Sequence, residues 1–147
     1  MIKKPVTKKD IICYLQKYRR AIQDIFSQVV HLYFKSGKIH FEYPYYSPRY
    51  EKIKRKINRV RDFNTLRKEG YPETLIKAFA ISELVEFWLY SEKINLSDLE
   101  RECLFWFYII HDFEYYDKFN KKYKKSDVRR LIDSAIRKIL KYNNNAI

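Results

Sequence analysis

The chain has 147 residues, 46% of them hydrophobic and 18% aromatic, and it carries a formal net charge of +13. That length and apolar content suit one folded domain with a buried core, and the two glycines and four prolines leave little room for long loops, which favours a helical protein. The sequence contains no run of about 18 uncharged apolar residues, so a transmembrane helix is not expected.

The charge is arranged in blocks along the chain. Residues 1–48 carry nine Lys or Arg against three Asp or Glu, and residues 49–70 repeat that count. Residues 71–117 reverse the balance, with three against ten, and residues 118–147 return to ten against two. A basic–acidic–basic chain suggests two cationic regions for a polyanion, and an acidic middle that could contact a neighbour's basic surface.

A long first helix is expected to begin after Thr7, which with Asp10 resembles a capping box with a shorter acid. Apolar residues recur at spacings of three and four as far as Tyr33, so the helix is predicted to end near Phe34. After a turn at Gly37 the residues alternate at period two. This alternation predicts one short strand or hairpin over residues 38–46.

A second helix is expected from Pro48, with a narrow apolar stripe and cations over most of its surface. Residues 64–72 read as a connection, and a third helix should run from Pro72 to about Tyr90. The capping box of Ser97 with Glu100 opens a fourth helix. Its stretch at residues 103–110 is apolar all round and is expected to be central, with Phe113 and Tyr116 continuing it. A last helix begins at a cap on Ser126.

The expected fold is therefore mainly α, with about five helices and one short strand or hairpin after the first helix. It forms a single domain over residues 1–147. Residues 10–70 make a helix–strand–helix part, residues 71–142 a helical part, and residues 143–147 a frayed tail.

No catalytic motif is recognisable: the chain lacks a P-loop and the patterns GxSxG, HExxH and GxGxxG. Cys13 and Cys103 stand in apolar helical patterns, and we interpret both as buried free thiols. Acid pairs such as Asp112 with Glu114 or Asp117 are interpreted as a charged helix face. The histidines lack metal-ligand spacing. We expect a non-enzymatic protein with no metal and no cofactor.

Basic residues interleaved with tyrosines are the main chemical signal, as in YRR, PRYEKIKRK and KKYKK. Lys and Arg attract phosphates without regard to base sequence, and Tyr can pack on sugars or bases. Thermophilic proteins also carry many surface cations, but residues 49–61 and 118–130 mostly lack the matching Glu. The candidate nucleic-acid-binding residues are Arg19, Arg20, Arg49, Lys52, Lys54, Arg55, Lys56, Arg59, Arg61, Lys121, Lys122, Lys124, Lys125, Arg129 and Arg130.

A family resemblance rests on the stretch YFKSGKIHFEYPYYSPRYEKIKRKINRVRDFNTLRKEGYP and the helix before it. This order resembles the back half of a RecB-type nuclease domain, particularly in the CRISPR-associated members. There a helix with a Gln-x-x-x-Tyr motif leads into a strand of the form YYxxGK…V, a helix rich in Ile and Lys or Arg, and a Gly-Pro connection. The resemblance covers about residues 10–72.

The chain departs from that family at its functional residues. The Asp and Glu-x-Lys catalytic strands would precede the first helix, where the sequence has nine residues. Gln16 is followed four residues later by Arg20 instead of Tyr, and the iron–sulfur cysteines after the Pro are missing. The resemblance implies a nuclease remnant that holds DNA without cutting it. That description is similar to the nucleocapsid proteins of tristromavirus type, from filamentous viruses of hyperthermophilic archaea.

We therefore expect a virion protein that coats double-stranded DNA through its phosphate backbone, by self-association or with a paralogous coat subunit. The two basic segments should form one continuous surface in the folded or assembled state. One alternative is a small basic accessory or regulatory protein of the host cytoplasm, such as a primase-associated helical domain or a viral anti-defence factor. Residual nuclease activity is a third, weaker interpretation.

Overall fold

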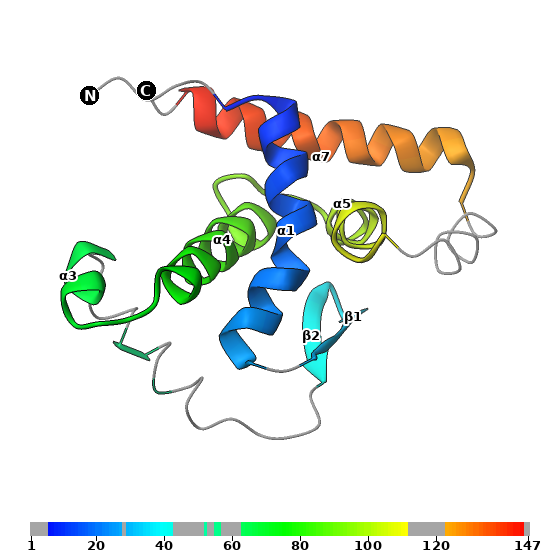
Figure 1. Cartoon of the computed structure of the whole chain (residues 1–147). Coiled ribbons are helices and arrows are strands. Elements are labelled where there is room, and N and C mark those ends of the chain that lie inside the picture. Colours follow the sequence, from blue (N-terminus) through cyan, green and yellow to red (C-terminus); the bar gives the residue numbers. More distant parts are fainter. Residues whose placement is uncertain are drawn as a thin grey trace.

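A computed structural model of the chain describes residues 6–27, 29–42, 52, 55–56, 63–111 and 123–145. Within these residues the fold is mainly α, as predicted, with five α-helices, one π-helical segment and one antiparallel hairpin after the first helix (Figure 1). The second helix predicted from Pro48 lies mostly outside the described residues. In chain order the elements are α1 (Lys8–Phe26), β1 (His31–Lys35), β2 (Lys38–Glu42), α3 (Phe63–Lys68), α4 (Glu73–Tyr90), α5 (Asp98–Leu104), η1 (Phe105–Ile110) and α7 (Lys125–Asn145).

Helix α1 begins at the predicted capping box. The Asp10 N–H donates to Thr7 Oγ1 at 3.2 Å, and the Thr7 N–H donates to Asp10 Oδ2 at 3.0 Å. The prediction that this helix reaches Phe34 is wrong, because α1 ends at Phe26 and Ser27 takes a left-handed φ of 56°. After Gln28 come the β-branched residues Val29 and Val30, and such residues favour extended backbone.

The hairpin explains why the sequence pattern predicts a strand only after the turn. Strand β2 pairs antiparallel with β1, so its partner is the segment that helical spacing predicts to be the end of the first helix. Ser36 and Gly37 have φ values of 56° and 76°, the geometry of a two-residue type I′ turn. Cross-strand pairing around this turn overrides the helical spacing. The predicted strand is confirmed over residues 38–42, and residues 43–46 lie outside the described part.

The predicted connection over residues 64–72 contains a short helix, α3, which corrects the sequence interpretation. Its Leu66 is fully buried, and the packing of this side chain holds the six-residue helix against α4. The Gly70 N–H donates to Arg67 O at 3.0 Å and the Tyr71 N–H donates to Leu66 O at 3.2 Å. Gly70 closes the helix with a φ of 88°. Helix α4 then begins directly after Pro72, close to the predicted start.

Helix α5 opens with the predicted capping box, which is confirmed. The Glu100 N–H donates to Ser97 Oγ at 3.1 Å, and the Ser97 N–H donates to Glu100 Oε1 at 2.9 Å. The helix then widens into the π-helix η1, whose Phe105 and Ile109 are buried, so the apolar stretch is central as predicted. His111 closes η1 with a left-handed φ of 51°. The expected continuation through Phe113 and Tyr116 lies outside the described residues.

Helix α7 is longer than predicted at both ends. It begins at Lys125, one residue before the expected cap at Ser126, and it extends to Asn145. The predicted frayed tail is therefore wrong for residues 143–145. The Val6 N–H donates to Asn144 Oδ1 at 3.1 Å and Asn144 Nδ2 donates to Val6 O at 3.3 Å. This exchange ties the end of α7 to the chain just before α1.

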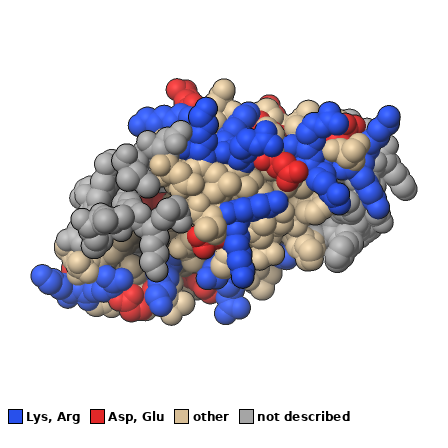
Figure 2. All heavy atoms as spheres, turned by 90° about the horizontal axis from the view of Figure 1, so that it is seen from above, with Lys and Arg blue, Asp and Glu red and all other residues tan. Residues whose placement is uncertain are grey.

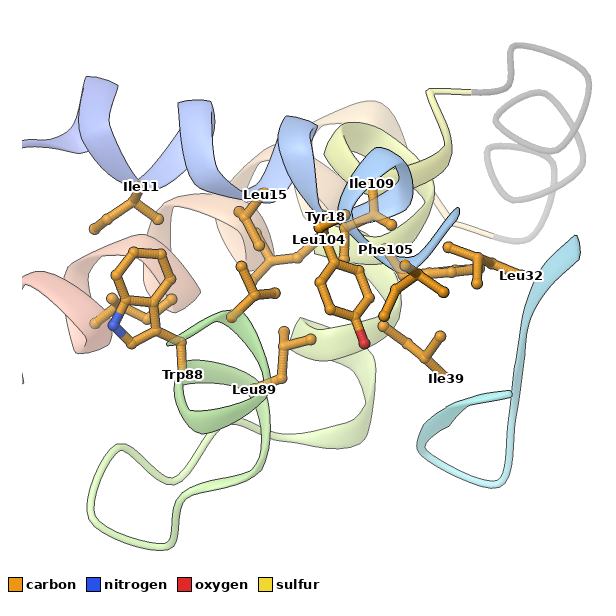
Figure 3. Packing of buried hydrophobic residues seen from close by; sticks show 14 of the residues in the cluster. Ile11, Leu15, Tyr18, Leu32, Ile39, Trp88, Leu89, Leu104, Phe105 and Ile109 are labelled. Carbon is orange, nitrogen blue, oxygen red and sulfur yellow. The ribbon is translucent and has the colours of Figure 1, made fainter. Parts of the chain in front are cut away.

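The core lies along the inner side of α1, where α4, η1 and the hairpin meet it (Figure 3). Fully burying a large apolar side chain stabilises a fold by about 1.5–3 kcal/mol, so this shared stripe holds the elements together. The inner face of the hairpin joins it through the ring pair Phe34–Phe105, with centroids 5.6 Å apart. The labelled core residues are Ile11, Leu15, Tyr18, Leu32, Ile39, Trp88, Leu89, Leu104, Phe105 and Ile109.

Candidate nucleic-acid interface

The outward face of α7 is the most basic helical surface in the described part of the chain. The helix carries six Lys or Arg against two Asp, a net charge of +4. Its apolar residues turn inward, which leaves the cations on the solvent side. Seen from above, the molecule shows many Lys and Arg side chains and fewer acidic ones (Figure 2). The exposed cations of α7 are Lys125, Arg129, Arg130, Arg137 and Lys141.

Four exposed cations cluster around the start of α7. Lys124, Lys125, Arg129 and Arg130 are exposed, and none forms an ion pair with an acid of the described residues. A helix N-terminus carries roughly +0.5 of an elementary charge within its first turn, so Lys124 and Lys125 add to a positive potential that Asp127 partly offsets. Arg129 and Arg130 lie one turn further along and add exposed positive charge to the same face.

Two ion pairs neutralise other charges of α7 and attach it to the fold. Lys8 Nζ on α1 lies 3.7 Å from Asp133 Oδ1, the acid in the middle of the outward face. Lys138 Nζ donates to Glu100 Oε1 at 2.7 Å. Burial opposes ionisation of Glu100, but the hydrogen bonds from Lys138 and the Ser97 backbone outweigh burial and hold its pKa below the usual value. The remaining cations of α7 stay available to an external anion.

The predicted residues Arg19 and Arg20 lie on the half of α1 that leads toward the hairpin, away from α7 (Figure 1). Both are exposed. Arg20 Nε lies 3.2 Å from Asp24 Oδ1 one turn later, an exposed pair of the kind that contributes little to stability. Arg19 has no acidic partner among the described residues. The two form a separate, smaller basic site.

Three predicted cations of the first basic segment are described, and they lie near α3. Lys52 and Arg55 are exposed. Lys56 is half-buried, with its Nζ 2.7 Å from Glu69 Oε2 and 5.5 Å from the centre of the Tyr71 ring. The hydrogen bond to Glu69 raises the pKa of Lys56. Its charge is thus largely engaged within the chain.

The described cations of the two basic segments do not meet within one copy of the chain. The start of α7 and the α3 region lie at opposite ends of the molecule (Figure 1). Among the described residues a single continuous cationic surface is therefore absent, and adjacent copies could bring these cations together. Six predicted residues fall outside the described part of the chain: Arg49, Lys54, Arg59, Arg61, Lys121 and Lys122.

The predicted thiols differ from each other. Both cysteines are free, and Cys103 is buried as predicted, but Cys13 is exposed because it lies on the outer side of α1. Burial raises the pKa of Cys103 to about 12, so its thiol is unreactive at neutral pH. No group of three His, Cys, Asp or Glu side chains suited to a metal ion occurs among the described residues.

The predicted binding residues leave out part of the cationic surface, whose outward orientation the helical spacing predicts, and one aromatic surface was missed altogether. Arg137 and Lys141 extend the outward face of α7, and their spacing with Arg130 shows this in the sequence. The second surface is the solvent side of the hairpin, where Tyr33 of β1 faces His40 of β2. The alternation on both sides of the Ser-Gly turn was the signal that could have found it.

Among the described helices none combines the length and the apolar character that crossing a membrane requires. Comparison of the chain with protein-family models, with curated proteins and with solved structures finds no significant match.

Proposed function

We propose that the chain is a non-enzymatic protein that coats double-stranded DNA without regard to base sequence, as a nucleocapsid subunit of a virion. The observation that carries the proposal is the outward face of α7, where exposed Arg and Lys accumulate without acidic partners in the described residues. Phosphate contacts of this kind position a protein on a duplex and carry no base information.

The distribution of positive charge over the chain favours binding of many copies along one duplex over binding of a single copy at one site. The basic surfaces on α7 and on α1 lie on different parts of one chain, so neighbouring copies would each present a cationic side to the same polyanion. Glu92, in the loop between α4 and α5, is exposed and forms no ion pair within the described residues, so it can contact a neighbour's cation. A repeated, non-closing contact of this type generates a filament.

The test compares duplex affinity between two matched triple variants. Arg129→Ala/Arg130→Ala/Arg137→Ala removes three cations from α7, and Lys68→Ala/Lys77→Ala/Lys93→Ala removes three exposed cations from α3, α4 and the following loop. Fluorescence anisotropy with two duplexes of equal length and unrelated sequence measures both. The α7 variant should weaken binding to both duplexes equally, and the control variant should lose much less because its cations lie outside the basic surfaces on α7 and α1.

Two results would count against the proposal. Equal losses in the two variants would mean that total charge alone drives binding. A fixed number of copies bound regardless of duplex length would favour an accessory protein that recognises one site.

A further inference from the structure

The solvent face of the hairpin carries a row of near-parallel aromatic rings. The ring centres of Tyr33 and His40 lie 5.2 Å apart with planes 18° from parallel, and those of His31 and Tyr33 lie 6.3 Å apart at 21°. His31 is exposed and the other two are half-exposed. The inner face of the hairpin supplies the core contacts, so these three rings are not needed to bury apolar surface.

Hydrogen bonds from α5 and α4 hold the hairpin, and with it the row of rings, in place. The Arg101 guanidinium reaches from α5 to the turn, with Nε donating to Gly37 O at 3.0 Å. The Ile39 N–H donates to the Tyr90 hydroxyl at 2.9 Å. One ring nitrogen of His40, Nε2, lies 3.0 Å from Lys35 O, which fixes that ring. A platform ordered before binding loses little entropy when a planar ligand stacks on it.

Two lysines flank the row at the turn. Lys35 and Lys38 pair across the strands two residues beyond Tyr33 and His40, a distance of about 6.8 Å along a strand, on the same face. Both are exposed, and neither has an acidic partner among the described residues. Glu42 lies at the far end of this face, opposite His31. The face therefore combines stacked rings with a cationic end and an acidic end.

We propose that this hairpin face binds unpaired bases of single-stranded nucleic acid. A base adds to the row as a further near-parallel ring, and its phosphate lies toward Lys35 and Lys38. Aromatic rings beside cations are the common means of holding single strands, because every base has a stackable face. Paired bases in a duplex are already stacked, so this face distinguishes single strands from duplexes, which the α7 surface does not.

The proposal is independent of the duplex coating by α7. The single-strand site consists of other residues on another element. It contacts bases, whereas the α7 surface contacts phosphates. A coat protein with both surfaces could hold melted segments or ends of a genome. The two functions can fail separately in one set of measurements.

The test replaces the central ring of the row. Tyr33→Leu removes the aromatic face and keeps an apolar residue on the strand, whereas Tyr33→Phe keeps the ring and removes only the hydroxyl. Anisotropy with a single-stranded oligonucleotide and with a duplex of equal length gives both affinities for each variant. Fluorescence of 2-aminopurine in the single strand reports stacking directly, and circular dichroism confirms that each variant is folded.

Tyr33→Leu should weaken single-strand binding by roughly five- to a hundredfold and abolish the 2-aminopurine quenching, with duplex binding unchanged. Tyr33→Phe should bind and quench as the wild type does. The proposal is overturned if folded Tyr33→Leu keeps wild-type single-strand affinity and quenching, or if it loses single-strand and duplex affinity equally. The α7 triple variant, measured alongside, reports on duplex coating and leaves this comparison intact.

Discussion

Single residues hold the turn of the hairpin in a conformation that few side chains accept. Gly37 has a φ of 76°, and a Cβ placed there would lie 2.6 Å from Asp98 Oδ1. Asp98 in turn pairs with Arg101. Gly70 shares the positive φ, at 88°, but has open space around it. A side chain at Gly70 would therefore meet backbone strain alone, whereas a side chain at Gly37 would meet both backbone strain and crowding.

Gly37→Ala should lower the free energy of unfolding more than Gly70→Ala does. Both substitutions incur the cost of a left-handed backbone, about 1–2 kcal/mol, and only the first must also displace Asp98. Urea denaturation followed by circular dichroism measures both. Equal losses would show that Asp98 moves aside at no cost.

The Glu100–Lys138 contact makes a pH-dependent contribution to stability. The pKa of Glu100 is lower in the folded chain than its usual value of 4.5, so the contribution is present above about pH 4.5 and is lost as pH falls through the folded pKa. Lys138→Met should lower the free energy of unfolding at pH 7 by about 1–2 kcal/mol, because the buried carboxylate loses a charged donor whose own side chain is partly solvated.

The control for that prediction is Lys141→Met, which removes an exposed cation of the same helix and should change stability little. The difference between the two variants should shrink as pH falls below about 4.5 and through the lower folded pKa of Glu100, where this carboxylate becomes protonated. A difference that stays constant from neutral to acidic pH would contradict the assigned role of Glu100.

At the scale of elements, Arg101 connects the hairpin to α5. Besides Gly37 O, its guanidinium donates through Nη1 to Leu96 O at 2.7 Å. Arg101→Met should leave two acceptors without their donor, lower stability by about 1–3 kcal/mol, and increase amide hydrogen exchange in β1 and β2 above that in α4. Arg101→Lys is the matched variant that keeps one donor. Uniform exchange across the protein would show that Arg101 does not fix the hairpin.

Local sequence signals predicted helix starts well and helix ends less well. The capping boxes at Thr7 and Ser97 lie where predicted, because each depends on residues only three apart. The end of α1 was misplaced, because Val29 and Tyr33 fit a helical stripe as well as a strand. Only the pairing of residues 31–35 with 38–42, across the turn, decides between them. A helix through residue 34 would place Val29 on the buried apolar stripe, but in the structure the Val29 side chain is 75% exposed.

The candidate site was predicted in part for a similar reason. The spacing of cations along α7 follows from one helix and could be foreseen. The ion pairs Lys56–Glu69 and Lys138–Glu100 join distant parts of the chain, so the sequence could not show which cations were already engaged. The row of His31, Tyr33 and His40 likewise exists only once the strands pair.

At the scale of the whole molecule, cations outnumber acids. The chain keeps a net charge of +13, and α7 carries six Lys or Arg against two Asp. Such a molecule repels its own copies until a polyanion neutralises it. Coating a duplex and copy-to-copy contact are therefore expected to occur together and to be weakened by salt.

The salt dependence of duplex binding tests this account most directly. The logarithm of the binding constant falls linearly with the logarithm of salt concentration, by about 0.9 for each phosphate contact. Arg129→Ala/Arg130→Ala/Arg137→Ala should reduce the steepness of that line by about 2.7, the share of three contacts. The Lys68→Ala/Lys77→Ala/Lys93→Ala control should keep the wild-type slope. If the two variants and the wild type give one common slope, α7 does not contact the duplex and the account is wrong.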